Sequence, residues 1–373
     1  SGGYGSQPAI FWGQMANEKL SWEKSHNFNI GLDWTLYNRV TLTFDYYNKL
    51  TKDLLFQMPV SYVTGFNSYW NNIGELKNQG LEFSISSQNI RTNDFSWTTD
   101  FNLTKQSIKV NKLPNGDDVQ YGDGNMYLLR EGESMHTFYL PKAKGVNSET
   151  GLMEFWIDPE DESKGVTPEY SKAGKTIVGK GVPDWIGGMT NTFRYKNFDL
   201  SVFINGSYGN KVYNYLSMKL THMNSPWTNQ LNAVNGRAQL VPINPNKVYE
   251  DGTMWYNDVS NVMVANPGAS IPRATINDPN DNDRISDRYI EDGSYIRLKN
   301  ISLGYTFPKK TIDKLGLSNL RIYANIQNLL TITGYDGYDP EIGASTSSVN
   351  VYGLDTGRYP SPTVYSFGLN VSF

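Results

Sequence analysis

The sequence has no cysteine, no long apolar run and no excess of basic residues. Because none of the 373 residues is a cysteine, a disulfide scaffold, a thiol nucleophile and a Cys-ligated zinc or iron site are excluded. No apolar stretch approaches the roughly 18 residues that a membrane helix needs, so membrane-spanning helices are excluded as well. The 33 Lys and Arg residues against 37 Asp and Glu give a net charge of −4, which argues against nucleic acid as a partner.

Histidines and targeting signals are also scarce. The three histidines, His26, His136 and His222, stand far apart, and this spacing predicts no histidine metal site. The first five residues carry no basic region, apolar core or cleavage site, so no secretory signal is visible. We therefore expect either a cytosolic protein or a chain whose true beginning lies upstream of Ser1.

The sequence is rich in aromatic residues, and its apolar residues recur at every second position. From residue 20 to residue 36 the even positions are mostly apolar or aromatic, whereas the odd positions are polar or glycine. Only a long strand separates such sets onto two faces. After a polar turn at residues 37–39 the alternation resumes from Val40 to Tyr46, which predicts a long hairpin with a tight turn.

The same alternation predicts eleven strands in all. The later ones are expected as hairpins at 81–103, about 134–158, 186–208 and 294–332, and as a final strand at 365–373. The hairpin at 134–158 has the weakest pattern and is expected to turn at 145–148. The last hairpin is expected to contain one helical turn in its connection, residues 308–319.

The connections between hairpins are long and rich in Gly, Pro, Asn and Asp, whereas the turns within hairpins are mostly short. The long ones are expected at about 54–76, 106–134, 158–185, 209–290 and 333–364. Short turns on one side and long loops on the other are typical of bacterial outer-membrane barrels, and strands of ten or more residues can cross that membrane. We therefore expect an all-β fold, a transmembrane antiparallel β-barrel with extracellular long loops and a periplasmic C-terminus.

Eleven strands whose ends lie on opposite sides of a membrane cannot close a barrel of even strand number. An open edge in lipid is forbidden because its N–H and C=O groups would have no partners. Residues 1–373 are therefore expected to be the C-terminal portion of a larger barrel. The interruption before Ser1 then falls within an external loop.

At the motif level the sequence resembles the SusC/RagA family of TonB-dependent transporters. The matching segments follow in order along almost the whole chain: Asp45-Tyr46-Tyr47-Asn48-Lys49, Thr51-Lys52-Asp53-Leu54-Leu55, Asn72-Ile73-Gly74, Lys77-Asn78-Gln79-Gly80-Leu81-Glu82, Pro183-Asp184-Trp185-Ile186-Gly187-Gly188, Asp292-Gly293-Ser294-Tyr295-Ile296-Arg297-Leu298-Lys299-Asn300, Leu303-Gly304-Tyr305, Asn325-Ile326-Gln327-Asn328-Leu329 and Gly337-Tyr338-Asp339-Pro340-Glu341.

This resemblance implies a 22-stranded barrel around an N-terminal plug, with the plug and the first barrel strands outside this chain. It also implies active import across the outer membrane of Bacteroidetes, driven by TonB and ExbBD, and no enzymatic activity. The implied partners are a SusD-like surface lipoprotein, the remaining N-terminal part of the same transporter and outer-membrane lipid. The implied substrates are glycans or oligopeptides, and no cofactor is implied.

The final strand has a second interpretation. Tyr365, Phe367, Leu369, Val371 and Phe373 alternate with polar residues and end in an aromatic carboxy terminus. This pattern resembles the signal by which the barrel-assembly machinery recognises an unfolded chain through strand addition. The alternative is an ordinary final strand, which would alternate in the same way.

Four loop aromatics are candidate ligand contacts: Trp227, Trp255, Tyr335 and Tyr338. Their rings can stack on sugar faces or on peptide side chains. Alternatively, they pack loop against loop or contact the lipoprotein. Trp22, Trp34 and Tyr46, near strand ends, are more simply an interfacial aromatic girdle.

Carboxylates offer two further hypotheses, neither of which is favoured. Asp281 and Asp283 lie in an acidic stretch that can hold a calcium ion, but Arg284 and Arg288 interrupt it, which favours a solvated, salt-bridged loop. Pairs such as Asp158 with Glu160 or Asp339 with Glu341 resemble a glycosidase pair. Such pairs are common in a chain with 37 carboxylates.

Three function classes remain open from the sequence. The first is part of a TonB-dependent importer, and the second is a passive porin or an autotransporter-type barrel. The second explains the alternation and Phe373 but leaves the ordered motifs unexplained. The third is a soluble carbohydrate-binding or hydrolytic β protein, which requires a second packed sheet to cover residues such as Leu32, Phe44 and Phe101.

Overall fold

The computed structural model is dominated by strands. It describes residues 2–4, 7–9, 15–60, 62–66, 68–72, 74–113, 116–223, 227–274, 284–341 and 352–373. Within this part, the α-helices are α1 (Tyr215–Thr221) and α2 (Lys309–Ile312), and no helix is long and apolar enough to cross a membrane. Contacts divide the chain into two units, Ser1–Met135 with Asp184–Lys196, and His136–Pro183 with Asn197–Phe373.

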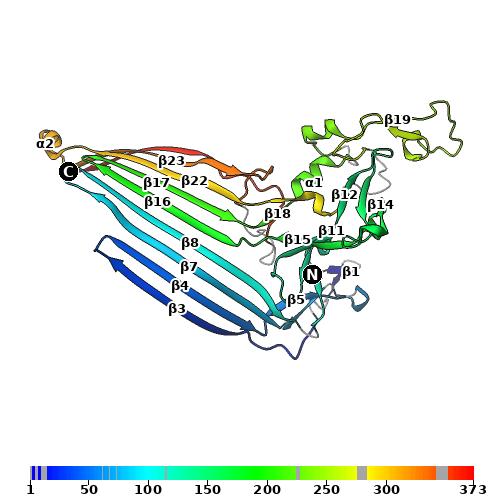
Figure 1. Ribbon diagram of the computed structural model, residues 1–373, viewed down its shortest axis with the longest axis horizontal. Helices are drawn as coiled ribbons and strands as arrows, with labels where there is room; N and C mark the ends of the chain where they lie inside the picture. The colour runs from blue at the N-terminus through cyan, green and yellow to red at the C-terminus, as the bar shows by residue number, and fades with distance from the viewer. Residues whose placement is uncertain are drawn as a thin grey trace. The chain divides into compact units, whose positions relative to one another are not determined.

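The first unit contains five long antiparallel strands in the order β16-β8-β7-β4-β3 (Figure 1). Their bounds are β3 (Lys24–Leu36), β4 (Val40–Lys52), β7 (Glu75–Arg91), β8 (Phe95–Lys112) and β16 (Trp185–Tyr195). Its shorter strands are β1 (Gly2–Tyr4), β2 (Gln7–Ala9), β5 (Leu55–Pro59), β6 (Ser68–Asn72), β9 (Val119–Tyr121) and β10 (Tyr127–Leu129).

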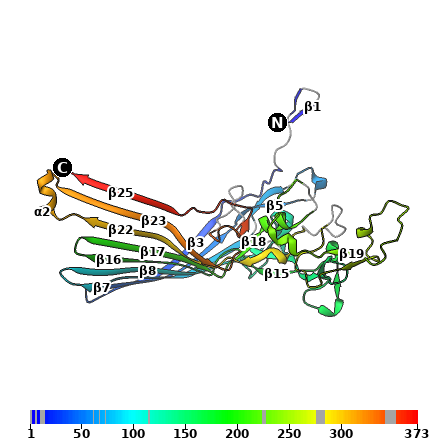
Figure 2. The same cartoon turned by 90° about the horizontal axis from the view of Figure 1, so that it is seen from above.

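The second unit contains four long antiparallel strands in the order β25-β23-β22-β17. Their bounds are β17 (Phe198–Tyr208), β22 (Tyr295–Thr306), β23 (Asn319–Thr333) and β25 (Val364–Ser372). Figure 2 shows β25 beside β23, with the C-terminus close to α2. The backbone N–H of Ser318, just after α2, donates to the Ser372 carbonyl at 2.8 Å.

Short strands of the second unit form several small sheets. In one, β11 (Thr137–Pro141) pairs with β15 (Lys175–Lys180). Others contain β12 (Ala143–Val146), β13 (Met153–Trp156) and β14 (Val166–Thr167), then β18 (Lys211–Asn214), β21 (Ile290–Asp292) and β24 (Leu354–Asp355), and finally β19 (Leu240–Pro242) with β20 (Val262–Val264).

The registers place apolar residues on one face of the long strands in each unit. In the second unit the cross-strand row Leu200, Leu303, Ala324 and Phe367 is apolar. The adjacent row, one residue along each strand, contains only Ser and Asn. Leu303 is 49% exposed and Phe367 is 84% exposed, so the apolar face is uncovered.

The first unit has the same organisation. Leu32, Phe44, Phe83 and Leu103 form one apolar row, and the neighbouring row contains Asp, Thr, Ser and Asn. Ile30 and Trp34, on the same face, are exposed, as is Leu369 in the second unit. The expected separation of apolar and polar residues onto two faces of the strands is therefore confirmed, and none of these three side chains lies in a protein core.

One predicted hairpin is wrong. Residues 134–158 do not form two long strands, because β11 pairs with β15 and only β12 and β13 pair with each other. The turn lies between β12 and β13, where the Asn147 side chain accepts hydrogen bonds from the N–H groups of Glu149 and Thr150, each at 2.9 Å. The described residues thus contain nine strands of 9 to 18 residues rather than eleven.

The physical reason is that this segment builds its own core. Phe138, Leu140, Met153 and Phe155 are buried on short strands, whereas a membrane strand keeps its apolar side chains on its outer face. The other long strands form where they were predicted, several of them extending further than the alternation indicated. The helical turn expected between 308 and 319 is confirmed as α2 followed by a 3-10 turn to Leu315.

Candidate functional site

The family-like motifs of the first unit contact one another at a glycine. A Cβ atom on Gly80 would lie 2.5 Å from the Tyr47 hydroxyl and 2.6 Å from the Lys105 carbonyl oxygen. Tyr47 therefore lies across β7 at the one position that has no side chain. This contact joins the motif at 45–49 to the motif at 77–82.

Asn72 joins two other motifs of this unit. Its side-chain amide donates to the carbonyl oxygen of Asp53 at 2.6 Å and to that of Ser21 at 3.0 Å. Its Oδ1 accepts from the Ser21 N–H at 2.9 Å. Gly74 has φ +97°, and a Cβ there would lie 2.0 Å from the Lys112 carbonyl oxygen. The motifs at 51–55 and 72–74 therefore fix the backbone where β4 ends and β7 begins.

In the second unit a buried cation joins two motifs that are about forty residues apart. Arg297 is 3% exposed and ion-pairs with Asp339. It also donates to Glu341 Oε2 at 2.7 Å and to Thr331 Oγ1 at 2.9 Å. Lys299 Nζ lies 2.5 Å from Glu341 Oε2. The motif at 292–300 is thus tied to the motif at 337–341 by an ion cluster.

This cluster decides what Asp339 can do chemically. Burial alone would raise the pKa of Asp339, but the Arg297 guanidinium and the N–H groups of Ser361 and Glu341 lower it more, so the pKa lies below its ordinary value. A general acid needs a raised pKa. Asp339 and Glu341 are therefore arranged as partners of Arg297 and Lys299 rather than as a glycosidase pair. Asp158 likewise pairs with Lys164 at 2.6 Å.

Tyr335 lies inside the loop region of the second unit. It is 5% exposed, and its hydroxyl donates to Asp355 Oδ2 at 2.5 Å. Burial and the Asp355 carboxylate raise the pKa of the phenol. Asp355 Oδ1 in turn accepts from the Gly357 N–H at 2.8 Å. This placement favours the loop-packing interpretation of Tyr335.

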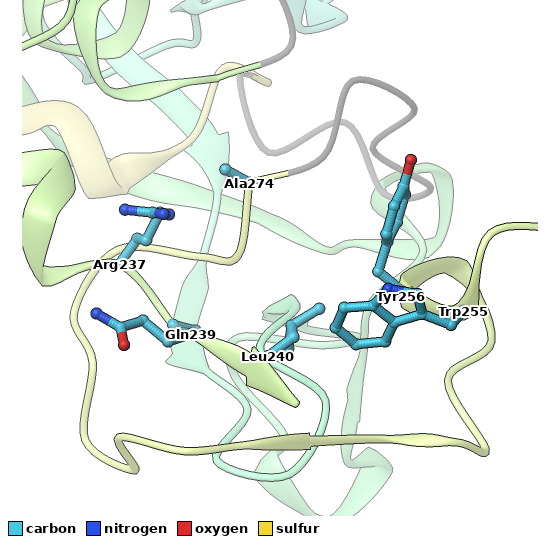
Figure 3. A pocket seen from close by; sticks show the side chains of 7 residues that line it. Arg237, Gln239, Leu240, Trp255, Tyr256 and Ala274 are labelled. Carbon is cyan, nitrogen blue, oxygen red and sulfur yellow. The ribbon is translucent and has the colours of Figure 1, made fainter. Parts of the chain in front are cut away.

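Trp255 lies on a cleft of about 530 Å³ in the second unit (Figure 3). In Figure 3 the indole is turned toward Leu240, while the ring of Tyr256 points away from it. The cleft is lined by Arg237, Ala238, Gln239, Leu240, Trp255, Tyr256 and Ala274. An aromatic face with a guanidinium and an amide nearby is a chemically plausible binding surface.

Tyr338 lies on a second cleft, of about 610 Å³, and the residue is 62% exposed. The walls come from α1, the 3-10 turns η6 (Asn232–Gly236) and η8 (Asp287–Tyr289), and the loop at 336–338. Asn214 fixes α1, because its Oδ1 caps the helix by accepting from the Ser217 N–H at 2.8 Å. Its amide donates to Glu291 at 2.9 Å.

The four predicted aromatics therefore do not form one site. Trp255 and Tyr338 line separate clefts, and Tyr335 is buried. Trp227 is 93% exposed and lines neither of these two clefts. Ligand contact by these side chains stays a prediction. The sequence interpretation missed Arg237 and Arg288, each of which lines one of the two clefts. Arg288 was visible only as an interruption of an acidic stretch.

The acidic stretch is salt-bridged where the structure describes it. Asp287 pairs with Lys142 at 2.9 Å, and Asp292 pairs with Lys211 at 3.4 Å. Asp281 and Asp283, the calcium candidates, and Asp278 lie outside the described residues. In the ranges that are described, no group of three or more His, Asp or Glu side chains is arranged to hold a metal ion.

His136 is buried, and burial lowers its pKa to about 4, so this imidazole is neutral at physiological pH. Its ring lies 5.0 Å from that of Tyr352, measured between centroids. These observations describe a packed loop histidine.

The final strand β25 is the terminal strand of its sheet, next to β23. Tyr365, Phe367, Leu369, Val371 and Phe373 all expose their side chains. Phe367 pairs with Ala324, Leu369 with Ile322 and Val371 with Leu320. A free edge with an apolar face suits strand addition, and the assembly signal stays a prediction.

Comparison with known proteins identifies relatives along nearly the whole chain. The model of the family "TonB dependent receptor-like, beta-barrel" matches residues 1–329. TonB-dependent receptor P3 of Formosa agariphila is 37% identical over 381 residues, covering 96% of this chain and 35% of that protein. TonB-dependent receptor SusC of Bacteroides thetaiotaomicron is 30% identical over 384 residues, covering 99% of this chain and 33% of that protein.

A solved structure has the same fold. The structure of the RagAB peptide transporter superposes with a TM-score of 0.76 at 23% identity, over 96% of this chain and 36% of that one. The chain therefore spans about a third of the length of the relatives it matches. With a family model matched over most of its residues and a resemblance to SusC and RagA now confirmed, this chain belongs to the TonB dependent receptor-like, beta-barrel family.

Proposed function

We propose that this chain is the C-terminal wall of an outer-membrane importer that takes up oligosaccharides or oligopeptides. The observation that carries the proposal is the uncovered apolar face of the long strands in both units, in rows such as Leu32 with Phe44 and Leu303 with Phe367. Such a face needs lipid or a second sheet to cover it. Family membership adds TonB dependence to the proposal.

Three partners follow from this proposal. The edge strands β3 and β25 need further strands, which the remaining N-terminal part of the same transporter supplies. TonB and ExbBD supply energy from the inner-membrane proton gradient. A SusD-like lipoprotein covers the long loops, which are extracellular while the C-terminus is periplasmic.

The loop region supports a role in binding rather than in catalysis. Its two clefts, of about 530 and 610 Å³, fall in the size range of small-ligand sites. Both lie in the long connections between barrel strands, where outer-membrane transporters carry their extracellular loops. The carboxylate pair Asp339 and Glu341 is held by cations and does not resemble a hydrolytic pair.

The test is uptake by whole cells of the native host that carry the full-length transporter. Radiolabelled peptide and glycan digests are added before and after a protonophore collapses the proton gradient. We expect accumulation of one digest that stops with the protonophore and is lost in a deletion strain. Accumulation that persists without the gradient supports a passive porin instead, and co-purification on a tagged transporter identifies the lipoprotein.

A further inference from the structure

The cleft beside Tyr338 contains an arginine that forms no ion pair with the residues that the structure describes. Arg288 lines this cleft, and its Nη1 atom is buried without a hydrogen-bond partner. Its guanidinium lies 5.6 Å from the centroid of the Tyr289 ring. A cation–π contact of this kind offsets only part of the cost of burying a charge.

The two carboxylates nearest to Arg288 along the chain are bonded to other groups, although Glu291 lines the same cleft. Asp287 pairs with Lys142 and accepts from the Ala143 N–H at 2.7 Å. Glu291 accepts from Asn214 at 2.9 Å and from the Asp336 N–H at 2.8 Å. Consistent with an uncompensated buried cation, burial lowers the pKa of Arg288.

The remainder of the cleft has an apolar part and a polar part, and the polar part is lined by Asn214, Ser217, Thr221, Asn232, Ser270 and the carboxylate of Glu291. Leu216, Leu231 and Ile271 line the apolar part, and the Asp336 side chain lies on the same cleft and is exposed. Beside its neutral polar side chains, the cleft therefore combines three features: a half-buried cation, an aliphatic surface and an exposed anion. A ligand that matches all three carries a carboxylate, an aliphatic group and an ammonium.

We propose that this cleft binds the C-terminal residues of a short peptide, with the peptide carboxylate on Arg288. The aliphatic side chains of the peptide lie against Leu216, Leu231 and Ile271, and Asp336 attracts its ammonium group. This assignment rests on the proposed import function and names the substrate class. An acidic sugar also has a carboxylate, but it carries neither aliphatic side chains to lie against Leu216, Leu231 and Ile271 nor an ammonium group for Asp336.

The experiment measures binding by calorimetry to the full-length transporter in detergent, so no transport step is involved. The probes are the tripeptide leucyl-alanyl-leucine, the same peptide with an amidated C-terminus, the same peptide with an acetylated N-terminus, and tri-galacturonate. We expect amidation to weaken binding to the wild type by about tenfold or more, the usual effect of losing a charge-assisted hydrogen bond. Acetylation should weaken it less, because Asp336 is exposed.

Two variants distinguish a specific contact with Arg288 from a general effect of positive charge near the cleft. In R288Q the free acid and the amide should bind within about twofold of each other, since the group that distinguishes them is gone. R284Q is the matched control, because it removes the same charge four residues earlier from an exposed side chain. R284Q should keep the tenfold preference for the free acid.

Several results would overturn the proposal. Equal binding of acid and amide by the wild type excludes a carboxylate site, and equal effects of R284Q and R288Q exclude a specific role of Arg288. Tighter binding of tri-galacturonate than of the tripeptide excludes a peptide site. Should R288Q fail to reach the membrane, R288K keeps the charge without the guanidinium fork and should lower the acid preference several-fold. Peptide binding without gradient-driven uptake would instead refute only the import function.

Discussion

The long strands and the loop region of this chain place their apolar side chains in opposite ways. Among the described residues, Val110 is the one buried apolar side chain that lies in a long strand. The loop region buries its apolar residues, for example Phe138, Tyr213 and Met218. The difference indicates two kinds of packing: the long strands leave one apolar face uncovered, as a barrel wall in lipid does, whereas the loops bury their apolar side chains in a core of their own.

The largest expected effect tests the loop core. Phe138→Ala removes a fully buried ring, and we expect a loss of about 3 to 5 kcal/mol of loop stability because a cavity remains. Limited proteolysis of the full-length transporter in detergent measures this loss as earlier cleavage within the loops. The matched control, Phe367→Ala, removes an exposed ring from β25 and should leave loop cleavage unchanged. Equal sensitivity of both variants would show that the comparison is mistaken.

A charge on the apolar face tests the strands. Leu303→Lys should cost about 2 to 4 kcal/mol if the side chain lies near the middle of the bilayer, and less nearer its surface. The neighbouring variant, Ser302→Lys, places the same charge on the polar face and should cost little. Heat-induced mobility shifts on gels and the yield of folded protein in the outer membrane measure the difference. A reversed order of the two variants would exchange the faces assigned to lipid and to the interior.

The smallest expected effect concerns pH. The pKa of Asp339 is below its ordinary value in the folded chain, so the ionised carboxylate stabilises the fold above the unfolded-state pKa of about 4. That contribution is lost as the pH falls through the lower, folded-state value. Thermal unfolding of the full-length transporter in detergent, followed from neutral to acidic pH, should show a loss that Asp339→Asn lacks. Parallel curves for both proteins would contradict the role of the Arg297 cluster.

The sequence predicted the strands much better than the loops. Alternation with period two is a local signal, so a row such as Leu32 with Phe44 follows from the pattern and the turn between them. The loops depend on distant pairings. β18 pairs in parallel with β24, joining Tyr213 to Leu354, and β11 pairs with β15 rather than with its neighbour. No local pattern specifies such partners.

The sequence predicted which types of residue line the clefts better than it predicted which individual residues do. Loop aromatics were expected to be candidates, and Trp255 and Tyr338 do line clefts. Tyr335 resembles them in sequence but is buried, and its hydroxyl donates a hydrogen bond to Asp355, twenty residues later. Arg288 stands between charged residues, where a solvated side chain is the ordinary expectation. Its burial follows from the loop fold and is invisible in the sequence.

The contact of Tyr47 with Gly80 has a consequence for how the wall is assembled. If β7 joined β4 two residues out of step, the phenol ring would meet the side chain of Asn78 or of Glu82. Both shifts keep the apolar residues on the correct face, so the burial of apolar side chains in lipid would not disfavour them. A tyrosine seated over a glycine thus distinguishes the right alignment of β4 and β7 from its nearest errors.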